Sequence, residues 1–305
     1  MDDQDDGADG RLGHLLPAVR PILGLPREER VRFAQEDRWV EYPAAAKALK
    51  VMADVVERPR GIRNRGRLLA GRADNGKTAL LHRFRALHPA ASLETGETSL
   101  PVILMSMPDD PGEAKFWGAL LSALRIPHRT TDAAKRHKEQ ALEVIRVLRS
   151  RALLVDEIHN LLEGSGRQQS HSFAMLKMVS NELAIPIIVA GTQRAVSVLN
   201  TDDQTATRFL PVELPPWRVS QDLRTFLAGM EAVLPLAEPS DLASKEMAEA
   251  LLAKSSETIG GLVFVLQEAT VLALRSGKER LDLKLVAAVE TATLASLDPK
   301  NRLDI

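Results

Sequence analysis

The sequence contains no cysteine, which excludes disulfide bonds, thiolate nucleophiles, and zinc or iron–sulfur sites that depend on cysteine ligands. It also lacks an excess of charge of either sign, because 40 Lys and Arg stand against 41 Asp and Glu in 305 residues. Five of the acids lie within the first ten residues, and the rest of the chain carries +4, from 40 basic and 36 acidic residues. A DNA-binding function therefore needs support from local basic clusters.

Long apolar runs are missing as well. No run approaches the roughly 18 residues that span a membrane, and residues 1–6 are acidic where a secretory signal is basic. We therefore expect a cytoplasmic protein. Hydrophobic residues make up 45 % and charged residues 27 % of the chain, a balance that is typical of a globular protein with a substantial core.

The first part of the chain differs from the rest. Residues 1–37 contain acidic residues, Gly and Pro without a sustained apolar period, which predicts a flexible N-terminal arm. A helix is expected from Pro43, a residue that suits a first helical position. Apolar residues recur at helical spacing after it, at Ala45, Leu49, Met52 and Val56.

Short apolar runs and helical patterns alternate over the middle of the chain. Buried strands are expected at residues 68–70, 102–105, 153–155, 187–190 and 212–214, and helices near 77–88, 113–125, 132–150 and 167–184. Parallel strands need crossover connections, so this alternation predicts a three-layer α/β core with a parallel sheet over residues 38–217. The helical pattern of residues 218–305 predicts a small α-helical subdomain.

The residues after the first predicted strand match the phosphate-loop pattern G-x-x-x-x-G-K-[ST]. In such a loop the backbone N–H groups and the dipole of the following helix bind phosphates, Lys77 neutralises the β and γ phosphates, and the Thr78 hydroxyl ligates Mg²⁺. The alternative is a glycine turn that matches by coincidence. We predict that ATP and Mg²⁺ are bound here by Gly71, Arg72, Ala73, Asp74, Asn75, Gly76, Lys77, Thr78 and Ala79.

Two adjacent carboxylates end the third predicted strand of the core. Asp156 and Glu157 lie where a strand end meets the phosphate loop in P-loop folds. Asp156 would hold the Mg²⁺ shell, and Glu157 would accept a proton from the attacking water. The alternative is a solvated acid pair in a turn. His159 is interpreted as a helix-start or surface histidine, because no second ligand follows at a metal-binding spacing.

The order of these motifs resembles a P-loop AAA+ ATPase, and more closely the TniB/TnsC family of transposition ATPases. The similar segments span about residues 38–290. They are RWVEYP at 38–43, GRADNGKT at 71–78, LLVDEIHNLL at 153–162, IPIIVAGT at 185–192, RF at 208–209, LPPW at 214–217 and TIG at 258–260. The resemblance implies a five-stranded parallel sheet followed by a helical lid subdomain.

The resemblance also implies roles for single residues. Thr192 resembles the sensor that orients the attacking water. Arg208 resembles the arginine finger that reaches a neighbouring subunit's ATP, which implies a homo-oligomer; an ordinary surface arginine is the alternative. Tyr42 is expected to border the adenine, or else to pack against the helix that follows it. The helix after Ile259 lacks the arginine that family members often carry there, which implies slow turnover.

Duplex DNA is the partner that the resemblance implies, held by its backbone within a ring or a helical filament. The expected contacts are Lys115, Arg129, Thr130, Thr131 and Lys135. A second basic cluster consists of Arg58, Arg60, Arg63, Arg65 and Arg67. Neither cluster has interleaved aromatic residues, which argues against stacking on single strands. Solvated surface charge is the alternative for both clusters.

Taken with the resemblance, these features predict an ATP-dependent regulator of DNA transposition in the bacterial cytoplasm. It would oligomerise on target DNA, couple a TniQ-like target-selection adaptor to a DDE transposase, and disassemble after hydrolysis. A helicase loader or DNA translocase is the alternative, and a signalling ATPase that does not contact DNA is a third interpretation. Three spaced carboxylates suited to strand transfer are not found, so we do not expect the chain to cut DNA itself.

Overall fold

The computed structural model describes residues 12–59, 64–109, 112–162, 166–193, 195–196 and 208–290. The chain divides into two compact units. One is Ala44–Pro215 and holds the sheet, and the other combines Met1–Pro43 with Pro216–Ile305. Within its described residues the second unit contains helices and no strands.

The α/β unit is built on a five-stranded parallel sheet with the strand order β4-β5-β6-β1-β7. The strands are β1 (Gly66–Gly71), β4 (Val102–Ser106), β5 (Ala152–Asp156), β6 (Ile187–Gly191) and β7 (Phe209–Leu214). The first crossover takes the chain from β1, inside the sheet, to β4 at its edge, and the following strands return toward β1. The α/β class and the parallel sheet predicted from the sequence are confirmed.

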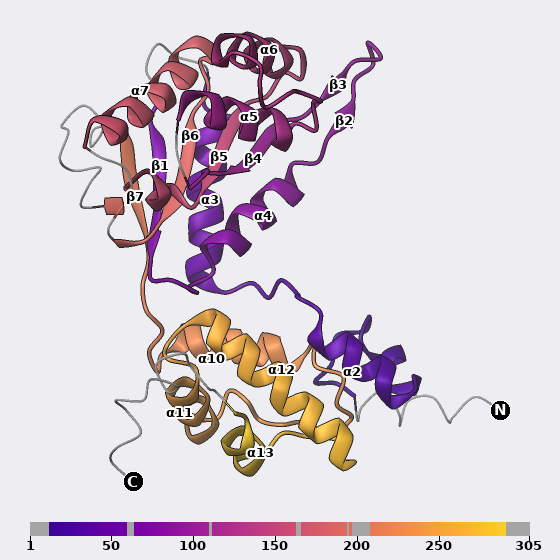
Figure 1. The fold of residues 1–305 in the computed structure, drawn as a ribbon. Coiled ribbons are helices and arrows are strands. Elements are labelled where there is room, and N and C mark those ends of the chain that lie inside the picture. Colours follow the sequence, from indigo (N-terminus) through magenta and orange to yellow (C-terminus); the bar gives the residue numbers. More distant parts are fainter. Residues whose placement is uncertain are drawn as a thin grey trace. The chain divides into compact units, whose positions relative to one another are not determined.

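Helices cover both faces of this sheet (Figure 1). On one face lie α5 (Glu113–Ala123), α6 (Ala134–Val147) and α7 (Gly166–Leu183), and on the other lie α3 (Pro43–Glu57) and α4 (Lys77–Leu87). The face with α5 to α7 encloses the main core, in which Trp117, Val155 and Val179 are fully buried. A short hairpin of β2 (Ala91–Ser92) and β3 (Thr98–Ser99) precedes β4.

The helical unit contains α10 (Gln221–Glu231), α11 (Lys245–Lys254), α12 (Ile259–Ser276) and α13 (Leu283–Ala288). Each begins at a residue whose side-chain oxygen accepts a hydrogen bond from the backbone N–H three positions later, which satisfies a donor that the helix leaves unpaired. These residues are Ser220, Ser244, Thr258 and Asp282. Local sequence therefore sets where all four helices begin.

The N-terminal part of the chain differs from the flexible arm predicted for residues 1–37. From residue 12 onward it is ordered, with η1 (Arg20–Gly24) and α2 (Arg27–Gln35), and α2 packs against α12. Val31 and Ala34 of α2 are buried, and Arg30 pairs with Glu279. The predicted arm of residues 1–37 is therefore corrected from residue 12; residues 1–11 lie outside the described part.

Helix α12 is long and apolar enough to cross a membrane by length and composition alone. It was not anticipated from the sequence, where no run of that kind was recognised. Eight of its residues are buried in the helical unit, where α2, α11 and α13 pack against it. The apolar character of α12 is therefore that of the central helix of this unit.

Candidate nucleotide-binding site

Three of the predicted motifs meet where the parallel strands of the sheet end. Strands β5, β6 and β1 are neighbours, and all run in the same direction. Their carboxyl ends therefore lie side by side, and each is followed by a motif singled out in the sequence. Glu157 follows β5, Thr192 follows β6, and the phosphate loop follows β1. The fold thus brings the phosphate loop together with Glu157, 79 positions after Thr78, and with Thr192, 114 positions after Thr78.

The phosphate loop has the backbone that an anion cradle requires. Asp74 has φ +58° and Gly76 has φ +78°, so two left-handed residues curl the loop before α4 begins at Lys77. A Cβ atom at Gly71 would lie 3.1 Å from the carbonyl oxygen of Leu214, which explains why glycine starts the loop. The loop therefore ends at a helix N-terminus, where phosphate groups bind. Arg72, Ala73, Thr78 and Ala79 are exposed around it.

Asn75 anchors this loop to the sheet, a role that the motif alone did not predict. Its side chain is buried, and Nδ2 donates 2.9 Å hydrogen bonds to the carbonyl oxygens of Leu214 and Pro215 at the end of β7. The middle of the motif, where the pattern allows any residue, thus carries a structural contact. The anchor fixes the loop against the edge strand.

Lys77, the first residue of α4, is buried. Its Nζ donates to the carbonyl oxygens of Gly71 at 3.1 Å and Arg72 at 2.6 Å. Burial lowers the pKa of the Lys77 ammonium below its ordinary value, while the carboxylates of Glu157, Asp156 and Asp74 oppose that shift. A partly desolvated cation enclosed by a curled backbone is suited to binding phosphate oxygens.

Thr78 and Asp156 form the part of the site suited to a magnesium ion. The Thr78 hydroxyl donates a 2.7 Å hydrogen bond to Oδ2 of Asp156, so the two oxygen ligands predicted from separate motifs lie side by side. Groups of three or more His, Asp or Glu side chains placed for a metal are absent from the described residues. Mg²⁺ keeps several waters and takes phosphate oxygens, so two protein oxygens suffice. The residues present therefore fit the ion.

Glu157 directly follows the proposed magnesium ligand and has a left-handed backbone, with φ +54°. Its N–H donates a 2.8 Å hydrogen bond to Oδ1 of Asp156, which fixes the turn. Its carboxylate Oε2 lies 3.0 Å from Nε2 of His159 in η2 (Ile158–Leu162). The contact between His159 and Glu157 was missed in the sequence, where His159 was interpreted as a helix-start or surface residue.

Thr192 lies at the end of β6, next to the strand that ends in Asp156. A Cβ atom at Gly191 would lie 2.5 Å from Cγ2 of Ile158 and 2.9 Å from Cβ of Ala195. Only glycine therefore lets the end of β6 approach η2 this closely. Gly191 thus packs against Ile158, the residue after Glu157, and the sensor role of Thr192 stays a prediction.

Arg208 lies at the amino ends of the strands, whereas the phosphate loop of the same chain lies at their carboxyl ends. It immediately precedes β7, and its carbonyl oxygen accepts a hydrogen bond from the N–H of Gly66, the first residue of β1. Because a six-residue strand spans about 20 Å, the guanidinium is remote from the loop after Gly71. Its Nη1 donates to Oδ1 of Asn181 at 3.1 Å. A catalytic role for Arg208 therefore requires the nucleotide of another subunit.

Tyr42 belongs to the helical unit, where it is 7 % exposed. Its ring packs against Trp217, with centroids 4.9 Å apart, and against Phe226 at 5.8 Å. Burial raises the pKa of the hydroxyl to about 12. The structure thus gives Tyr42 a packing role, and contact with adenine stays a prediction.

The predicted DNA contacts lie on and between α5 and α6. Lys115 is exposed near the start of α5, and Arg129, Thr130 and Thr131 are exposed in the turn before α6. Lys135 lies 3.9 Å from Glu139, one helical turn further. The turn is held by the buried His137, whose Nε2 bonds the carbonyl oxygen of Arg129 at 2.9 Å. Four of the five residues thus lie in the turn before α6 and its first helical turn, and Lys115 lies on α5.

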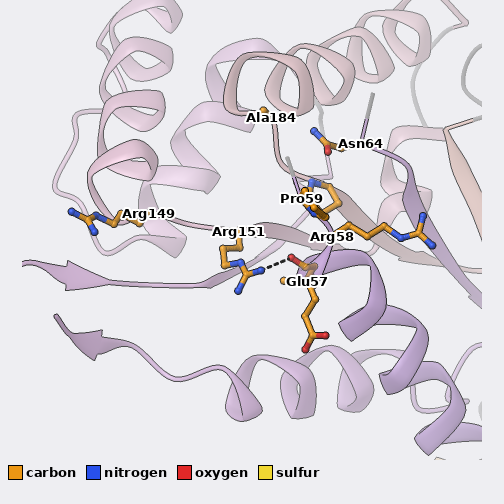
Figure 2. A pocket seen from close by; sticks show the side chains of 9 residues that line it. Glu57, Arg58, Pro59, Asn64, Arg149, Arg151 and Ala184 are labelled. Atoms are coloured by element: carbon orange, nitrogen blue, oxygen red, sulfur yellow. Dashed lines mark hydrogen bonds between the residues drawn. The ribbon is translucent and has the colours of Figure 1, made fainter. Parts of the chain in front are cut away.

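The second basic cluster is less suited to DNA. Arg60 and Arg63 lie outside the described residues, and Arg67 is buried with its Nη1 on the carbonyl oxygen of Gly66. Arg58 lines a cavity of about 300 Å³ with Arg149 and Arg151 (Figure 2). The side chains of Arg58 and Arg149 point in opposite directions there, and Nη2 of Arg151 donates to the carbonyl oxygen of Val56. This cavity lies at the amino ends of the strands, away from the phosphate loop.

The comparison with protein families agrees with these motifs. The family described as "Bacterial TniB protein" matches residues 30–219, which is more than half of the chain. The match includes the phosphate loop, the acid pair, Thr192 and Arg208. No curated protein sequence matches the chain.

Solved structures show the same fold at low identity. The chain is similar to the Aeropyrum pernix ORC1 protein in complex with DNA, at 16 % identity and a TM-score of 0.59, over 85 % of this chain and 68 % of that one. The Aeropyrum pernix ORC2 protein, solved as ADPNP and ADP complexes, gives 17 % and 0.57 over 85 % and 70 %. The Thermotoga maritima RuvB branch migration motor gives 16 % and 0.51 over 84 % and 71 %.

At these identities the structural similarity establishes the fold, that of a P-loop AAA+ ATPase. The family match covers the segment that contains the whole nucleotide site. This chain therefore belongs to the TniB family of AAA+ ATPases.

Proposed function

We propose that this protein is an ATP-dependent regulator of DNA transposition. In its ATP-bound form it assembles on target duplex DNA, links a TniQ-like target-selection adaptor to a DDE transposase, and leaves the DNA after hydrolysis. Membership of the TniB family supports the assignment to transposition. The proposal includes a cytoplasmic location.

One observation carries the ATP-dependent part of this proposal. The hydrogen bond of 2.7 Å between Thr78 and Asp156 joins the phosphate loop to the acid pair. A coincidental glycine turn and an unrelated solvated acid pair would have no reason to meet. Their contact at the carboxyl edge of the sheet is the arrangement that a nucleoside triphosphate site requires.

The residues of the site then have separate tasks in hydrolysis. Thr78 and Asp156 would hold a magnesium ion, which would supply positive charge to the phosphates when bound. Lys77 releases its two backbone carbonyl partners and donates to phosphate oxygens. Glu157 accepts a proton from the water whose oxygen bonds to the γ phosphorus, while the bond from that phosphorus to the β–γ bridging oxygen breaks. Thr192 orients this water through its hydroxyl.

Arg208 makes the active site a shared one in this proposal. Its position at the amino ends of the strands, away from its own phosphate loop, supports action on a neighbour's nucleotide. A guanidinium there stabilises the charge of the transition state. A head-to-tail interface of this kind generates rings or helical filaments. Hydrolysis would therefore depend on assembly.

DNA is the proposed track for that assembly, bound by phosphate contacts. Arg129, Thr130 and Thr131 are exposed in one turn, and within the described part of the chain Arg129 has no ion pair. An exposed guanidinium beside two hydroxyls is suited to a phosphate backbone and carries no base specificity. Lys115 and Lys135 are proposed to extend this contact.

Electron microscopy of the full chain tests the proposal. The protein would be imaged with duplex DNA and a non-hydrolysable ATP analogue, and in parallel with DNA and ADP. We expect rings or filaments on DNA with the analogue only, and stimulation of a DDE transposase by the assembled form. Equal assembly with ADP, or loading of a helicase ring without any effect on a transposase, would contradict the proposal.

A further inference from the structure

The carboxylate proposed as the general base has a side-chain partner in the same turn. Nε2 of His159 lies 3.0 Å from Oε2 of Glu157, and one residue, Ile158, separates the two in sequence. Within the described residues, His159 is the one basic side chain found within 4 Å of the Glu157 carboxylate. The Glu157 side chain is 43 % exposed and that of His159 is 33 % exposed, so water can reach the carboxylate while the contact is made.

The surroundings of the imidazole determine what His159 can do. An ionised carboxylate only accepts hydrogen bonds, so the ring nitrogen that faces Glu157 must carry the hydrogen. The other nitrogen, Nδ1, is buried and has no hydrogen-bond partner in the described structure. His159 therefore donates through Nε2, which suits it to orienting the carboxylate of Glu157.

Glu157 needs such a partner because only its backbone is fixed by other contacts. Its N–H is bonded to Asp156, and its carbonyl oxygen accepts from the N–H of Asn160 at 3.0 Å. The side chain beyond the backbone has three rotatable bonds and considerable rotamer freedom. A single hydrogen bond from His159 selects one of its orientations.

Glu157 itself lies beside the phosphate loop. Glu157 directly follows Asp156, whose Oδ2 accepts a 2.7 Å hydrogen bond from Thr78 at the end of that loop. In agreement with this position, the carboxylate of Glu157 opposes the lowering of the Lys77 pKa by burial. Its charge therefore lies close to the lysine that is to hold the phosphates. The position of His159 is in turn set by η2, which Gly191 lets approach β6 and which Asn160 ties to the carbonyl oxygen of Met107.

We propose that His159 is a positioning residue for ATP hydrolysis, which holds the carboxylate of Glu157 toward the phosphate loop. This inference rests on the proposed ATPase activity and names a residue that the sequence motifs left without a function. His159 does not contact the nucleotide in this proposal. Its loss therefore lowers the rate of hydrolysis without weakening ATP binding.

Two substitutions of His159 distinguish the role of its N–H donor from the role of the ring's shape. His159→Phe keeps an aromatic ring and removes the N–H, whereas His159→Gln places an amide N–H near the position of Nε2. We expect kcat to fall about tenfold in the Phe variant with KM for ATP unchanged, and to stay within about threefold of wild type in the Gln variant. His88→Phe is the matched control, because His88 makes a comparable 2.8 Å hydrogen bond to the carbonyl oxygen of Phe84 at the far end of α4.

A double-mutant cycle completes the test. In single-turnover measurements, His159→Phe should cause no further loss in a Glu157→Gln background, because the group that it positions is already gone. If the wild-type protein does not hydrolyse ATP, the proposed function itself is overturned. If the wild-type protein hydrolyses ATP and the His159→Phe variant is equally active, only the role of His159 is overturned. Equal losses in the Phe and Gln variants, or additive losses in the cycle, would also overturn it.

Discussion

The Thr78 hydroxyl donates to Oδ2 of Asp156 across 78 positions of sequence, at 2.7 Å. This contact gives the metal-binding prediction a specific test. Thr78→Ala removes one of the two oxygen ligands and leaves the backbone cradle intact. We expect ATP affinity in the presence of Mg²⁺ to fall about tenfold, while the weaker affinity in EDTA stays the same. Titration with a fluorescent ATP analogue under both conditions measures this.

A loss of equal size in both conditions would contradict the assignment of Thr78 to the metal. Ala86→Ser is a suitable control, since Ala86 is an exposed residue near the other end of α4, outside the predicted ATP-binding set. Its affinity should remain at the wild-type value in both conditions.

Glu157→Gln should separate binding from hydrolysis. The amide keeps the size of the side chain but accepts a proton poorly, so we expect hydrolysis to fall at least about 100-fold. ATP affinity should be unchanged, because the phosphate loop and both metal ligands remain. Without hydrolysis the protein should stay assembled on DNA, and sedimentation with duplex DNA after ATP addition measures this. Rapid release of DNA by the variant would contradict the role of Glu157.

The sheet and the phosphate loop could be predicted from the sequence because their signals are local. Each strand of the core is a short run of apolar residues, and the loop pattern lies between a strand and a helix. The contact between His159 and Glu157 has no such signal, because its geometry depends on the left-handed backbone of Glu157 and the turn that follows. Glu157 and His159 were therefore interpreted separately, although they are two positions apart.

The packing of the N-terminal segment could not be predicted for a different reason. Helix α2 is short and mostly charged, and only Val31 and Ala34 are buried, so its apolar period is too brief to recognise. Its partner α12 lies more than 200 positions later in the chain. The position of Arg208 likewise follows from the parallel register of β7 with β1, which sequence spacing does not reveal.

The shared active site can be tested by mixing two inactive variants. Lys77→Ala should lose ATP binding by about 30-fold or more, since it removes a buried cation from the phosphates. Arg208→Ala should bind ATP normally and hydrolyse it slowly. In a mixed assembly an Arg208→Ala subunit can receive the intact finger of a Lys77→Ala neighbour. We expect the mixture to recover up to about a quarter of the wild-type rate, the share of interfaces with that arrangement.

Recovery must depend on both proteins being present in one assembly. Dilution below the concentration at which the protein assembles should therefore abolish it. An Arg208 that served its own chain would give no recovery at any ratio of the two variants. That result would overturn the shared site while leaving the phosphate loop assignment intact.

The exposed turn between α5 and α6 predicts a salt-dependent contact with DNA. Arg129→Ala should weaken binding to duplex DNA of any sequence and reduce the slope of log affinity against log salt by about 1. Arg85→Ala serves as the control, because Arg85 is an exposed arginine at the end of α4. Gel-shift titrations at several salt concentrations measure both slopes. Equal slopes for wild type and Arg129→Ala would exclude this turn from the interface.

The pair of Arg30 and Glu279 predicts how acid affects the helical unit. Burial alone would raise the pKa of Glu279, but hydrogen bonds from Arg30 and from the N–H of Ala237 lower it below its ordinary value of 4.5. A lowered folded-state pKa means that the ionised pair stabilises the fold above about pH 4.5 and that this contribution is lost as pH falls through the folded-state pKa. Stability of the wild type should therefore decrease in acid.

Glu279→Gln should remove that contribution at neutral pH. We expect the free energy of unfolding at pH 7 to fall by about 1–2 kcal/mol, because the charged hydrogen bonds to Arg30 are lost. The variant should then lose less stability than wild type between pH 5 and pH 3, since the carboxylate that titrates there is gone. Urea unfolding at both ends of this range measures the difference. Glu238→Gln is the control, because Glu238 is 62 % exposed and only 4.0 Å from Arg280. A loss of the same size in this control would show that the Arg30 contact does not stabilise the unit.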